Sequence, residues 1–523
     1  MKQQDPKKIV VRLLPGVDAE PLYRGQVPGS TVDCRLLLLG DRHRQLLRAY
    51  TELVYRMSRP GDLKTIAAGV LESAEIQQYY DVSSLANGDV GLTLRDAIFQ
   101  EQYPLDSDDF ALRITAGSRV MTVPLPLERF RALGTLLPLL AGDKGDNEIA
   151  LGLEETLDPD EQEWSRELLA KLDAQGFLQR GPMRSNSFLI SPVRPRVTFV
   201  GHTSILLQTA GATVLTDPLL RNLLRSPSRA FDITRLQLTA ICCTHSHWDH
   251  CDVETLLRFD KRIPIIIPSV HQATAFNPPI GPVLRRLGFR DIRELDPWQS
   301  QQLGDVEMVL VPFHGEQDEP GAVIDHYTYV FRTRDLTLYG GVDAYRDTFS
   351  DMNSVLTRVR DEYRPSVAFL PISRMVYRYE HGGVNGFCRY IDTTLLGQDF
   401  QYTAGPEEAA EWVRLLGVST VVPYATFTFS PYATPHELHR FAVALKKNGL
   451  EATLLPLRPL DSLELSDLDG SVRAVRRRRL LRAWHRSAGR ATLLDQRLRR
   501  YALYRFGWRL LEGSAPSTAS HHH

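Results

Sequence analysis

The chain has 523 residues, with 62 Lys and Arg against 63 Asp and Glu. This length suffices for two or three domains with sizeable cores, and the balanced charge gives no global signature of nucleic-acid binding. Apolar runs fall short of the roughly 18 residues that suggest a membrane-spanning helix, and residues 9–14 are too short for the apolar core of a signal peptide. We therefore expect no membrane span.

The five cysteines are too few and too irregularly spaced for a disulfide framework. Their odd number indicates reduced thiols and a cytoplasmic protein. Residues 512–523 are interpreted as a tail that ends in a three-histidine expression tag, and they are excluded from the functional reading.

Residues 1–195 contain no cluster of metal-ligand side chains, and we expect an amino-terminal α+β domain there. Apolar spacing predicts helices at 126–142 and 147–153, a third that opens at 158–159, and a strand that begins at 177–178 after Gly176. This succession resembles a winged-helix module over 108–180, which would bind a partner. A purely structural or dimerisation role is the alternative.

Residues 196–460 carry the chemical motifs and follow a proline-containing linker at 181–195. Short apolar runs predict strands at 197–200, 205–208, 214–216, 238–243, 263–267, 308–311, 327–331, 336–339, 367–370 and 418–422. Helical periodicity predicts helices at 283–287, 347–360, 406–416 and 435–447. Strands that alternate with helices indicate a layered α/β domain.

Four potential metal ligands lie within six residues directly after the strand predicted at 238–243. They are His245, His247, Asp249 and His250. His245 and His247 alternate, so both leave the strand end on the same side, while Asp249 and His250 follow in the next turn. Histidines can also cluster by chance on a surface loop. Four ligand-type residues at this spacing nevertheless predict a two-metal site.

Together with Gly201-His202-x-Ser204, Thr216-Asp217-Pro218 and Asp343, this pattern resembles the metallo-β-lactamase fold. The resemblance implies an αββα sandwich over 196–460, preceded by a separate α+β domain. It also implies that Asp343 bridges two metals and that Asp217 orients a ligand histidine.

Two positions depart from the hydrolases of this fold. Those enzymes use a histidine near position 314, where this chain offers both His314 and Glu316 as ligands. They also carry a histidine near the end of the strand predicted at 418–422, where we place Pro423. His436 and His439 could replace it but are expected on the surface of a helix. One imidazole fewer and one carboxylate more would favour iron or manganese over zinc.

These departures, with Gly315-Glu316-Gln317, resemble the di-iron β-hydroxylases of nonribosomal peptide biosynthesis, a branch of the same fold. The resemblance implies a monooxygenase that hydroxylates an aminoacyl group on an acidic peptidyl carrier protein. The group would be tethered through phosphopantetheine, and two iron ions, O2 and an external electron donor would take part. The implied ligands are His245, His247, Asp249, His250, Glu316 and Asp343, with Glu316 and Asp343 as catalytic carboxylates. A binuclear hydrolase of a thioester, lactone or phosphodiester is the alternative.

Two further segments suggest what the protein binds. Arg374 and Tyr377 lie in a loop that would border the metal site and contact substrate, although a solvated loop has the same composition. We expect 461–511 to be a basic helical tail; its residues 471–511 hold 13 arginines and one acidic residue. Such a segment would dock an acidic carrier protein, and an anionic membrane surface is a second option. Nucleic acid is not expected as a partner, and a homodimer through residues 1–195 is an expectation from the resemblance.

Overall fold

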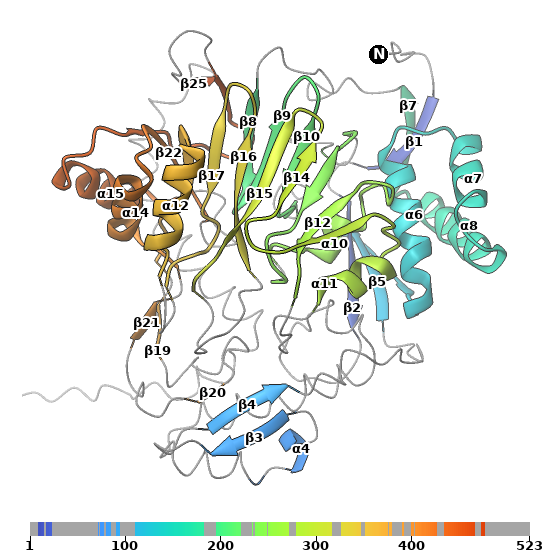
Figure 1. The fold of residues 1–523 in the computed structure, drawn as a ribbon. Helices are drawn as coiled ribbons and strands as arrows, with labels where there is room; N and C mark the ends of the chain where they lie inside the picture. Colours follow the sequence, from blue (N-terminus) through green and yellow to red (C-terminus); the bar gives the residue numbers. More distant parts are fainter. Residues whose placement is uncertain are drawn as a thin grey trace, which may run out of the picture.

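The computed structural model describes residues 9–14, 17–23, 72, 74–77, 80–84, 90–94, 110–182, 195–220, 233, 236–247, 249–270, 279–315, 326–346, 351–374, 376–378, 390–391, 399–401, 403–425, 433–465 and 472–475. Two mixed β-sheets pack face to face and carry helices on their outer faces (Figure 1). The helices α12, α14 and α15 cover one sheet, while α10, α11 and the amino-terminal helices lie on the side of the other. This is the four-layer αββα arrangement expected from the sequence.

The first sheet has the strand order β13-β12-β11-β10-β9-β8-β24-β25. Its strands are β8 (Arg196–Gly201), β9 (Ser204–Gln208), β10 (Thr213–Thr216), β11 (Ala240–Cys242), β12 (Ile265–Pro268), β13 (Ile292–Leu295), β24 (Ser462–Leu465) and β25 (Val472–Val475). Strands β10 to β13 run parallel. Nearly every residue of β8 to β12 is buried because both faces of this sheet are covered.

The second sheet has the order β14-β15-β16-β17-β18-β22-β23. Its strands are β14 (Ser300–Leu303), β15 (Val306–Pro312), β16 (Tyr327–Arg332), β17 (Thr337–Gly340), β18 (Val367–Pro371), β22 (Thr420–Tyr424) and β23 (Thr453–Leu454). Strands β17, β18, β22 and β23 run parallel. The carboxyl ends of parallel strands meet at one edge of a sheet, so residues that follow them are brought together.

The outer helices of this region are α10 (Val253–Leu256), α11 (Ile280–Arg286), α12 (Asn353–Tyr363), α14 (Pro406–Leu416) and α15 (Pro435–Lys447). The predicted bounds of α14 and α15 are confirmed. Each begins at a proline in its first turn, where the missing N–H costs nothing. Thr434 caps α15 by accepting a hydrogen bond from the Glu437 N–H at 3.2 Å. No helix in the described parts of the chain is long and apolar enough to cross a bilayer.

The amino-terminal region contains the predicted three helices and strand. They are α6 (Phe130–Ala141), preceded by the 3₁₀ turn η1 (Leu127–Arg129), then α7 (Asp146–Glu154), α8 (Pro159–Ala174) and β7 (Leu178–Pro182). Strand β7 pairs with β1 (Ile9–Leu13) from the start of the chain. The strands β2 (Asp18–Tyr23), β5 (Phe110–Ala116) and β6 (Arg119–Pro124) form a separate three-stranded sheet.

The core of this amino-terminal region is continuous with the outer layer of the first sheet. One buried apolar cluster joins Leu133 and Leu137 of α6 to Leu257 and Leu287 near α10 and α11. Side chains at the end of β11 point alternately to the two cores. Cys242 faces the core between the sheets, whereas Cys243, the next residue, faces this outer cluster. The two regions of the chain therefore share a hydrophobic core.

Two further small sheets lie outside the sandwich. The hairpin β3 (Tyr80–Ser84) and β4 (Val90–Leu94) follows α4 (Ala74–Gln77) and pairs with β20 (Tyr390–Ile391). Strands β19 (Val376–Arg378) and β21 (Asp399–Gln401) form a second pair. The loop predicted to border the metal site therefore contains β19 and β20, and β20 pairs with the amino-terminal region.

The predicted basic helical tail from residue 461 is wrong in its first part. Residues 462–465 and 472–475 are the strands β24 and β25, and β24 extends the first sheet by pairing with β8. The reason is visible in Ser-Leu-Glu-Leu, which alternates polar and apolar residues with the period of a strand, and in the two β-branched valines of Val-Arg-Ala-Val. The sandwich therefore continues to residue 475 rather than ending at 460. The rest of the tail lies outside the described residues.

The contact between α6 and the first sheet's outer layer gives a test of this packing. A Cβ at Gly134 would lie 2.6 Å from the Leu287 carbonyl oxygen, which is backbone and has little room to move. We expect Gly134→Ala to lower the free energy of unfolding by about 1–3 kcal/mol through overpacking. This would outweigh the roughly 0.5–1 kcal/mol that alanine normally gains over glycine in a helix.

Gly152→Ala in α7 is the matched control for a chemical denaturation experiment. Its Cβ would meet only the Leu139 side chain, 2.7 Å away, which can rotate aside. Equal denaturation midpoints for the two variants would contradict the tight contact between α6 and Leu287.

Candidate metal centre

The predicted ligands that the structure describes, together with the orienting residue Asp217, gather where parallel strands of both sheets end. Asp217 follows β10, the 245–250 motif follows β11, and Asp343 follows β17. A backbone hydrogen bond from the Tyr327 N–H to the Thr244 carbonyl, 3.1 Å long, ties the start of β16 to the motif. The sandwich edge therefore brings together side chains that lie far apart in sequence.

His245 and His247 form the first half of the cluster. Their Nε2 and Nδ1 atoms lie 2.9 Å apart, and both side chains are buried. The ring of His326, at the start of β16, packs against both, with centroid distances of 4.7 Å to His245 and 5.1 Å to His247. Burial, and then the positive charge of His250, lowers the pKa of His326 to about 3. A neutral ring therefore borders this half of the cluster.

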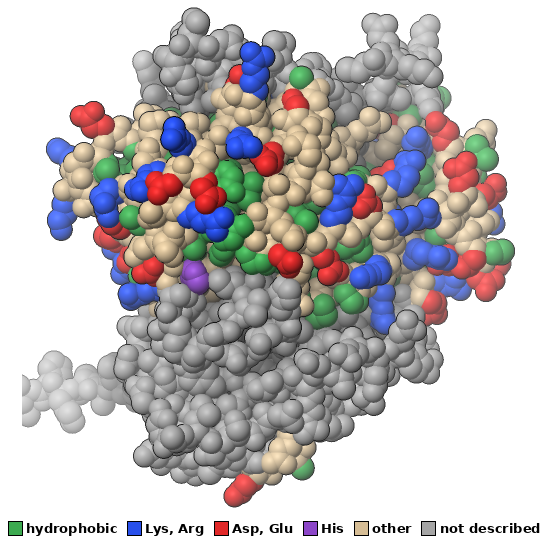
Figure 2. Space-filling view, viewed as in Figure 1, with side chains coloured by type: hydrophobic (Ala, Val, Ile, Leu, Met, Phe, Trp, Pro, Cys, Tyr) green, Lys and Arg blue, Asp and Glu red, His purple; other side chains and the backbone are tan. Residues whose placement is uncertain are grey.

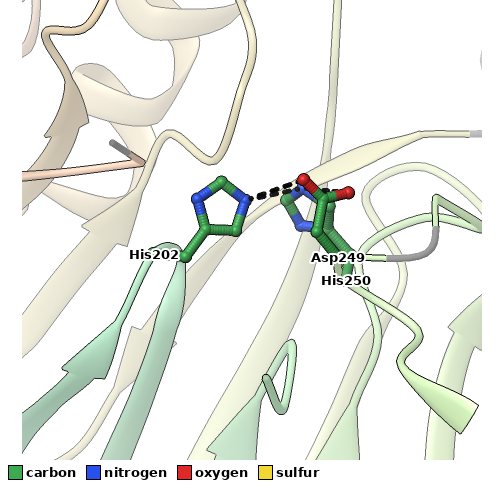
Figure 3. A group of neighbouring side chains, drawn as sticks. All are labelled: His202, Asp249 and His250. Carbon is green, nitrogen blue, oxygen red and sulfur yellow. Dashed lines mark hydrogen bonds and ion pairs between the residues drawn. The ribbon is translucent and has the colours of Figure 1, made fainter. Parts of the chain in front are cut away.

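The second half combines His250, Asp249 and His202 (Figure 3) with Asp343. His250 Nε2 lies 3.1 Å from Asp343 Oδ2 and 3.9 Å from Asp249 Oδ1. His202 comes from the turn between β8 and β9 and points at the same group, with Nε2 3.4 Å from Asp249 Oδ2. All four residues are buried or nearly so.

Asp217 fixes the geometry of the motif. Its carboxylate accepts hydrogen bonds from the Thr244 N–H at 2.7 Å and the Thr244 hydroxyl at 2.8 Å. The same carboxylate lies 3.0 Å from His250 Nδ1, so this nitrogen is the donor and Nε2 is directed toward Asp343. A buried carboxylate thus sets the orientation of one imidazole, as in the outer shells of metal sites.

The backbone around the cluster is strained at four positions. His202, Asp217, Val342 and Ala425 have φ values of +52°, +38°, +50° and +50°. For a β-branched residue such as Val342 this left-handed conformation is a genuine outlier. It is held by a 2.6 Å hydrogen bond from the Val342 N–H to the Tyr424 hydroxyl, next to Asp343. Strain of this kind gathers at functional sites, where the surroundings enforce it.

The electrostatics of the cluster favour a cation. Burial opposes the charged form of His250, but the carboxylates of Asp217 and Asp343 raise its pKa well above the usual value. Burial also opposes ionisation of Asp249, yet the contact with His202 and the charge of His250 hold its pKa well below the usual range. Buried carboxylates therefore hold positive charge here, and a metal ion would replace protons on the histidines.

One carboxylate oxygen supports the fit of a metal directly. Asp343 Oδ1 is buried and accepts no hydrogen bond from any residue that the structure describes. An uncompensated buried carboxylate oxygen is costly, whereas a cation beside it would satisfy it. The donor set of imidazoles and carboxylates is one that zinc and iron both accept. The residues present therefore fit a metal pair.

Glu316, the predicted carboxylate ligand, lies outside the described residues. The chain that leads to it is described: the Tyr345 N–H donates to the His314 carbonyl at 2.7 Å, two residues beyond Asp343. Gly315 then has φ +112°, which allows a sharp change of direction. The chain that leads to Glu316 therefore starts next to the segment that carries Asp343, at the end of β17.

The end of β22 is the place where the sequence predicts a missing imidazole. Pro423 lies within β22 opposite Leu370, and it is Ala425, just past the strand, whose N–H donates to the His202 carbonyl at 3.0 Å. Neither residue can ligate through its side chain, whereas the His202 imidazole approaches the cluster from the turn between β8 and β9. His436 and His439 are exposed on α15, as expected.

Arg374 makes contacts that its place in a loop did not predict. Its guanidinium lies 2.7 Å from Glu408 and 3.5 Å from Glu407, and Glu407 also pairs with Arg440 of α15 at 2.7 Å. These ion pairs tie the loop after β18 to α14 and α15. Tyr377 lies in β19, and its side chain is outside the described parts.

Comparison with known proteins identifies the fold. Residues 196–359 match the beta-lactamase superfamily domain. The crystal structure of CmlA, a diiron β-hydroxylase from Streptomyces venezuelae, superposes with a TM-score of 0.59 at 16% identity. The match covers 87% of this chain and 100% of that one. The protein has the metallo-β-lactamase fold.

Two relatives in sequence differ in chemistry. A Streptomyces venezuelae protein named 4-amino-L-phenylalanyl-[CmlP-peptidyl-carrier-protein] 3-hydroxylase is 33% identical over 126 residues, 23% of this chain. The match spans only 24% of that relative's own length. A UPF0173 metal-dependent hydrolase from Rubrobacter xylanophilus is 27% identical over 279 residues, 51% of this chain and 96% of the relative. The predicted resemblance to the metallo-β-lactamase-fold β-hydroxylases is confirmed.

Sequence reasoning did not assign His202 to the metal centre of this metallo-β-lactamase fold. It lies 43 positions before His245, so no local spacing connects the two. The sequence feature that could have indicated His202 is its position directly after β8, in the Gly201-His202-x-Ser204 pattern. That pattern contributed only to the recognition of the fold.

Asp217→Asn tests the orienting carboxylate. The amide keeps the size of the side chain but removes its charge and places a donor where His250 Nδ1 needs an acceptor. We expect the affinity for the metal ions to fall by about 10–100-fold, measured by chelator competition. Asp252→Asn is the control, because Asp252 is equally buried and accepts from the N–H and hydroxyl of Thr255. Equal metal affinities in the two variants would contradict the role of Asp217.

Proposed function

We propose that the protein is a di-iron, O2-dependent monooxygenase that hydroxylates the β-carbon of an aminoacyl group tethered to a peptidyl carrier protein. The observation that carries this proposal is the match to CmlA, which extends over the full length of that diiron β-hydroxylase and 87% of this chain. The similarity therefore includes the amino-terminal region as well as the sandwich. The 33% identity to a carrier-protein-dependent 3-hydroxylase adds to it, because C3 of an amino acid is the β-carbon.

Each residue has a defined task in this proposal. His245, His247, His250, Asp249, Asp343 and Glu316 would hold the metals. When bound, two irons would supply the activation of O2, in which one oxygen atom enters the substrate C–H bond and the other leaves as water with two electrons and two protons. Asp217 keeps the His250 ring in one orientation, 3.0 Å away. The buried cluster excludes bulk water from the reacting centre.

The reaction can be tested before the amino acid is identified. Carrier protein loaded with a panel of aminoacyl groups would be incubated with iron-loaded enzyme, a chemical reductant and isotopically labelled O2. The proposal predicts that one labelled oxygen enters at the β-carbon of at least one group, detected by mass spectrometry of the released pantetheine arm. Free amino acids serve as the control. Hydroxylation of the free acids at equal rates would contradict the need for a carrier.

A binuclear hydrolase is the second candidate, and two observations favour it. The cluster contains four imidazoles, a ligand type that zinc accepts, and the UPF0173 relative is covered over 96% of its length. Here the metals would polarise a carbonyl or phosphoryl group and activate water. Turnover of a thioester, lactone or phosphodiester by the zinc-loaded protein without O2 uptake would establish it.

An acidic carrier protein remains the proposed partner, and the arginines at 476–479 remain its proposed contact. On the face seen in Figure 2, acidic and basic side chains of the described surface are interspersed, and no single-sign patch stands out. Replacing the four arginines by glutamine should weaken carrier binding and its salt dependence. Substitution is preferable to truncation at residue 471, which would remove β25 from the first sheet. Unchanged affinity would remove this contact from the proposal.

A further inference from the structure

We infer that His202 is itself a metal ligand and completes the second metal position with Asp249, His250 and Asp343. This inference rests on the two-metal site of the proposed function but not on the reaction that the site performs. Its basis is the convergence of four side chains from three separate elements on one small volume. His202, Asp249 and His250 each offer a ligand atom, and these atoms lie within 4.8 Å of one another (Figure 3).

The distances are those of a coordination shell. His202 Nε2 lies 3.4 Å from Asp249 Oδ2, 3.4 Å from His250 Nε2 and 3.9 Å from Asp343 Oδ2. Ligands that bind one ion at about 2.0–2.2 Å are separated by roughly 3.0–3.6 Å in octahedral or tetrahedral geometry. A charge-assisted hydrogen bond between an imidazole and a carboxylate is shorter, about 2.7–2.9 Å. The spacing around His202 thus fits a shared ion better than direct pairing.

The contact between two imidazole nitrogens supports the same conclusion. At 3.4 Å, His202 Nε2 and His250 Nε2 can share at most one hydrogen. The Nδ1 of His250 is already engaged by Asp217, so its Nε2 is the nitrogen available to a metal. A cation between the two Nε2 atoms would attract both, and Asp249 and Asp343 would balance its charge.

The backbone at position 202 also indicates a functional side chain. His202 has φ +52°, a conformation that costs a residue other than glycine about 1–3 kcal/mol. The turn is fixed by the hydrogen bond from the Ala425 N–H to the His202 carbonyl, 3.0 Å long. The turn thus holds a buried imidazole in a conformation that glycine would adopt more easily. The chain at the end of β22 therefore contributes a backbone hydrogen bond that holds His202, and not a ligand side chain.

His202→Gly is the sharpest variant for a test. Because φ is positive, glycine fits the turn, so the metal-free variant should remain folded, as checked by thermal unfolding. The missing ring leaves a space at the ligand position. Metal-stripped full-length protein would be titrated with Co²⁺, with bound metal counted by mass spectrometry and coordination followed by visible absorption. The prediction is a fall from about two tightly bound Co²⁺ ions per chain to one, restored to two by free imidazole.

The outcomes separate the alternatives. His439→Ala, an exposed histidine on α15, is the control and should bind two ions. Two tightly bound ions with an unchanged spectrum in His202→Gly would overturn the inference. So would a weakened second ion that imidazole does not restore, because His202 would then only position Asp249. If the unaltered protein binds a single ion, the two-metal site of the proposed function fails, but loss of that ion in His202→Gly would still support the ligand.

Discussion

Asp343→Asn is expected to reduce the affinity for the second metal ion by more than about 100-fold, a larger loss than residues outside the coordination shell cause. The carboxylate lies 3.1 Å from His250 Nε2, and its other oxygen is buried without a hydrogen bond from the described residues. A bridging carboxylate reduces the repulsion between two nearby cations, and a neutral amide cannot. The measurement is metal stoichiometry after dialysis against a weak chelator, together with the rate of product formation.

Asp351→Asn is the control for this variant. Asp351 is exposed and accepts hydrogen bonds from Asn353 at the start of α12. Its substitution removes one negative charge, as Asp343→Asn does, but at a residue that does not contact the cluster residues described above. The control should keep both metals. An Asp343→Asn protein that also retains two tightly bound ions and full activity would exclude the bridging role.

Glu316→Ala is expected to lower the iron content from about two toward one ion per chain and to abolish O2-dependent turnover. Glu316 lies outside the described residues, but the chain reaches it from Gly315, next to the contact between His314 and Tyr345. A carboxylate there would add a third hard oxygen donor beside those of Asp249 and Asp343. This donor favours iron over zinc, so its removal should also raise the relative affinity for zinc.

His314→Ala is the paired variant, because His314 offers the alternative ligand two positions earlier. Both proteins would be loaded with Fe²⁺ without oxygen and assayed for bound iron. The account predicts loss in Glu316→Ala and retention in His314→Ala. The opposite pattern would assign the ligand to His314 and move the site toward the hydrolase pattern.

The regular elements were predictable because their periodicity is local. In α14 and α15 the apolar periodicity predicted a helix, and Pro406 and Pro435 predicted where each helix begins. The motif at 245–250 predicted metal binding because its four ligand types lie on one turn after a buried strand. Asp343 was found only through the resemblance, since nothing near it in sequence shows that the end of β17 meets the end of β11.

The features that the sequence did not predict are mostly contacts between segments that lie far apart in the chain. The strand β24 was hidden by the arginine-rich stretch that follows it, although Leu463 and Leu465 alternate as a strand requires. His202 and Ala425 meet through a backbone hydrogen bond across 223 positions of sequence, 425 minus 202, and no spacing rule predicts that contact. The sequence therefore suggested a site short of one imidazole, and the fold brings the His202 imidazole beside the motif from the turn after β8. As a result, the choice between iron and zinc depends on the relatives and on Glu316.

The most direct test of the central claim is the metal content of the purified protein, with the tag removed, combined with O2 consumption in the presence of a reductant. The account predicts about two irons per chain, a change in near-ultraviolet absorption on reduction and re-oxidation, and uptake of O2 coupled to substrate hydroxylation. Two tightly held zinc ions, hydrolytic turnover and no consumption of O2 would contradict it.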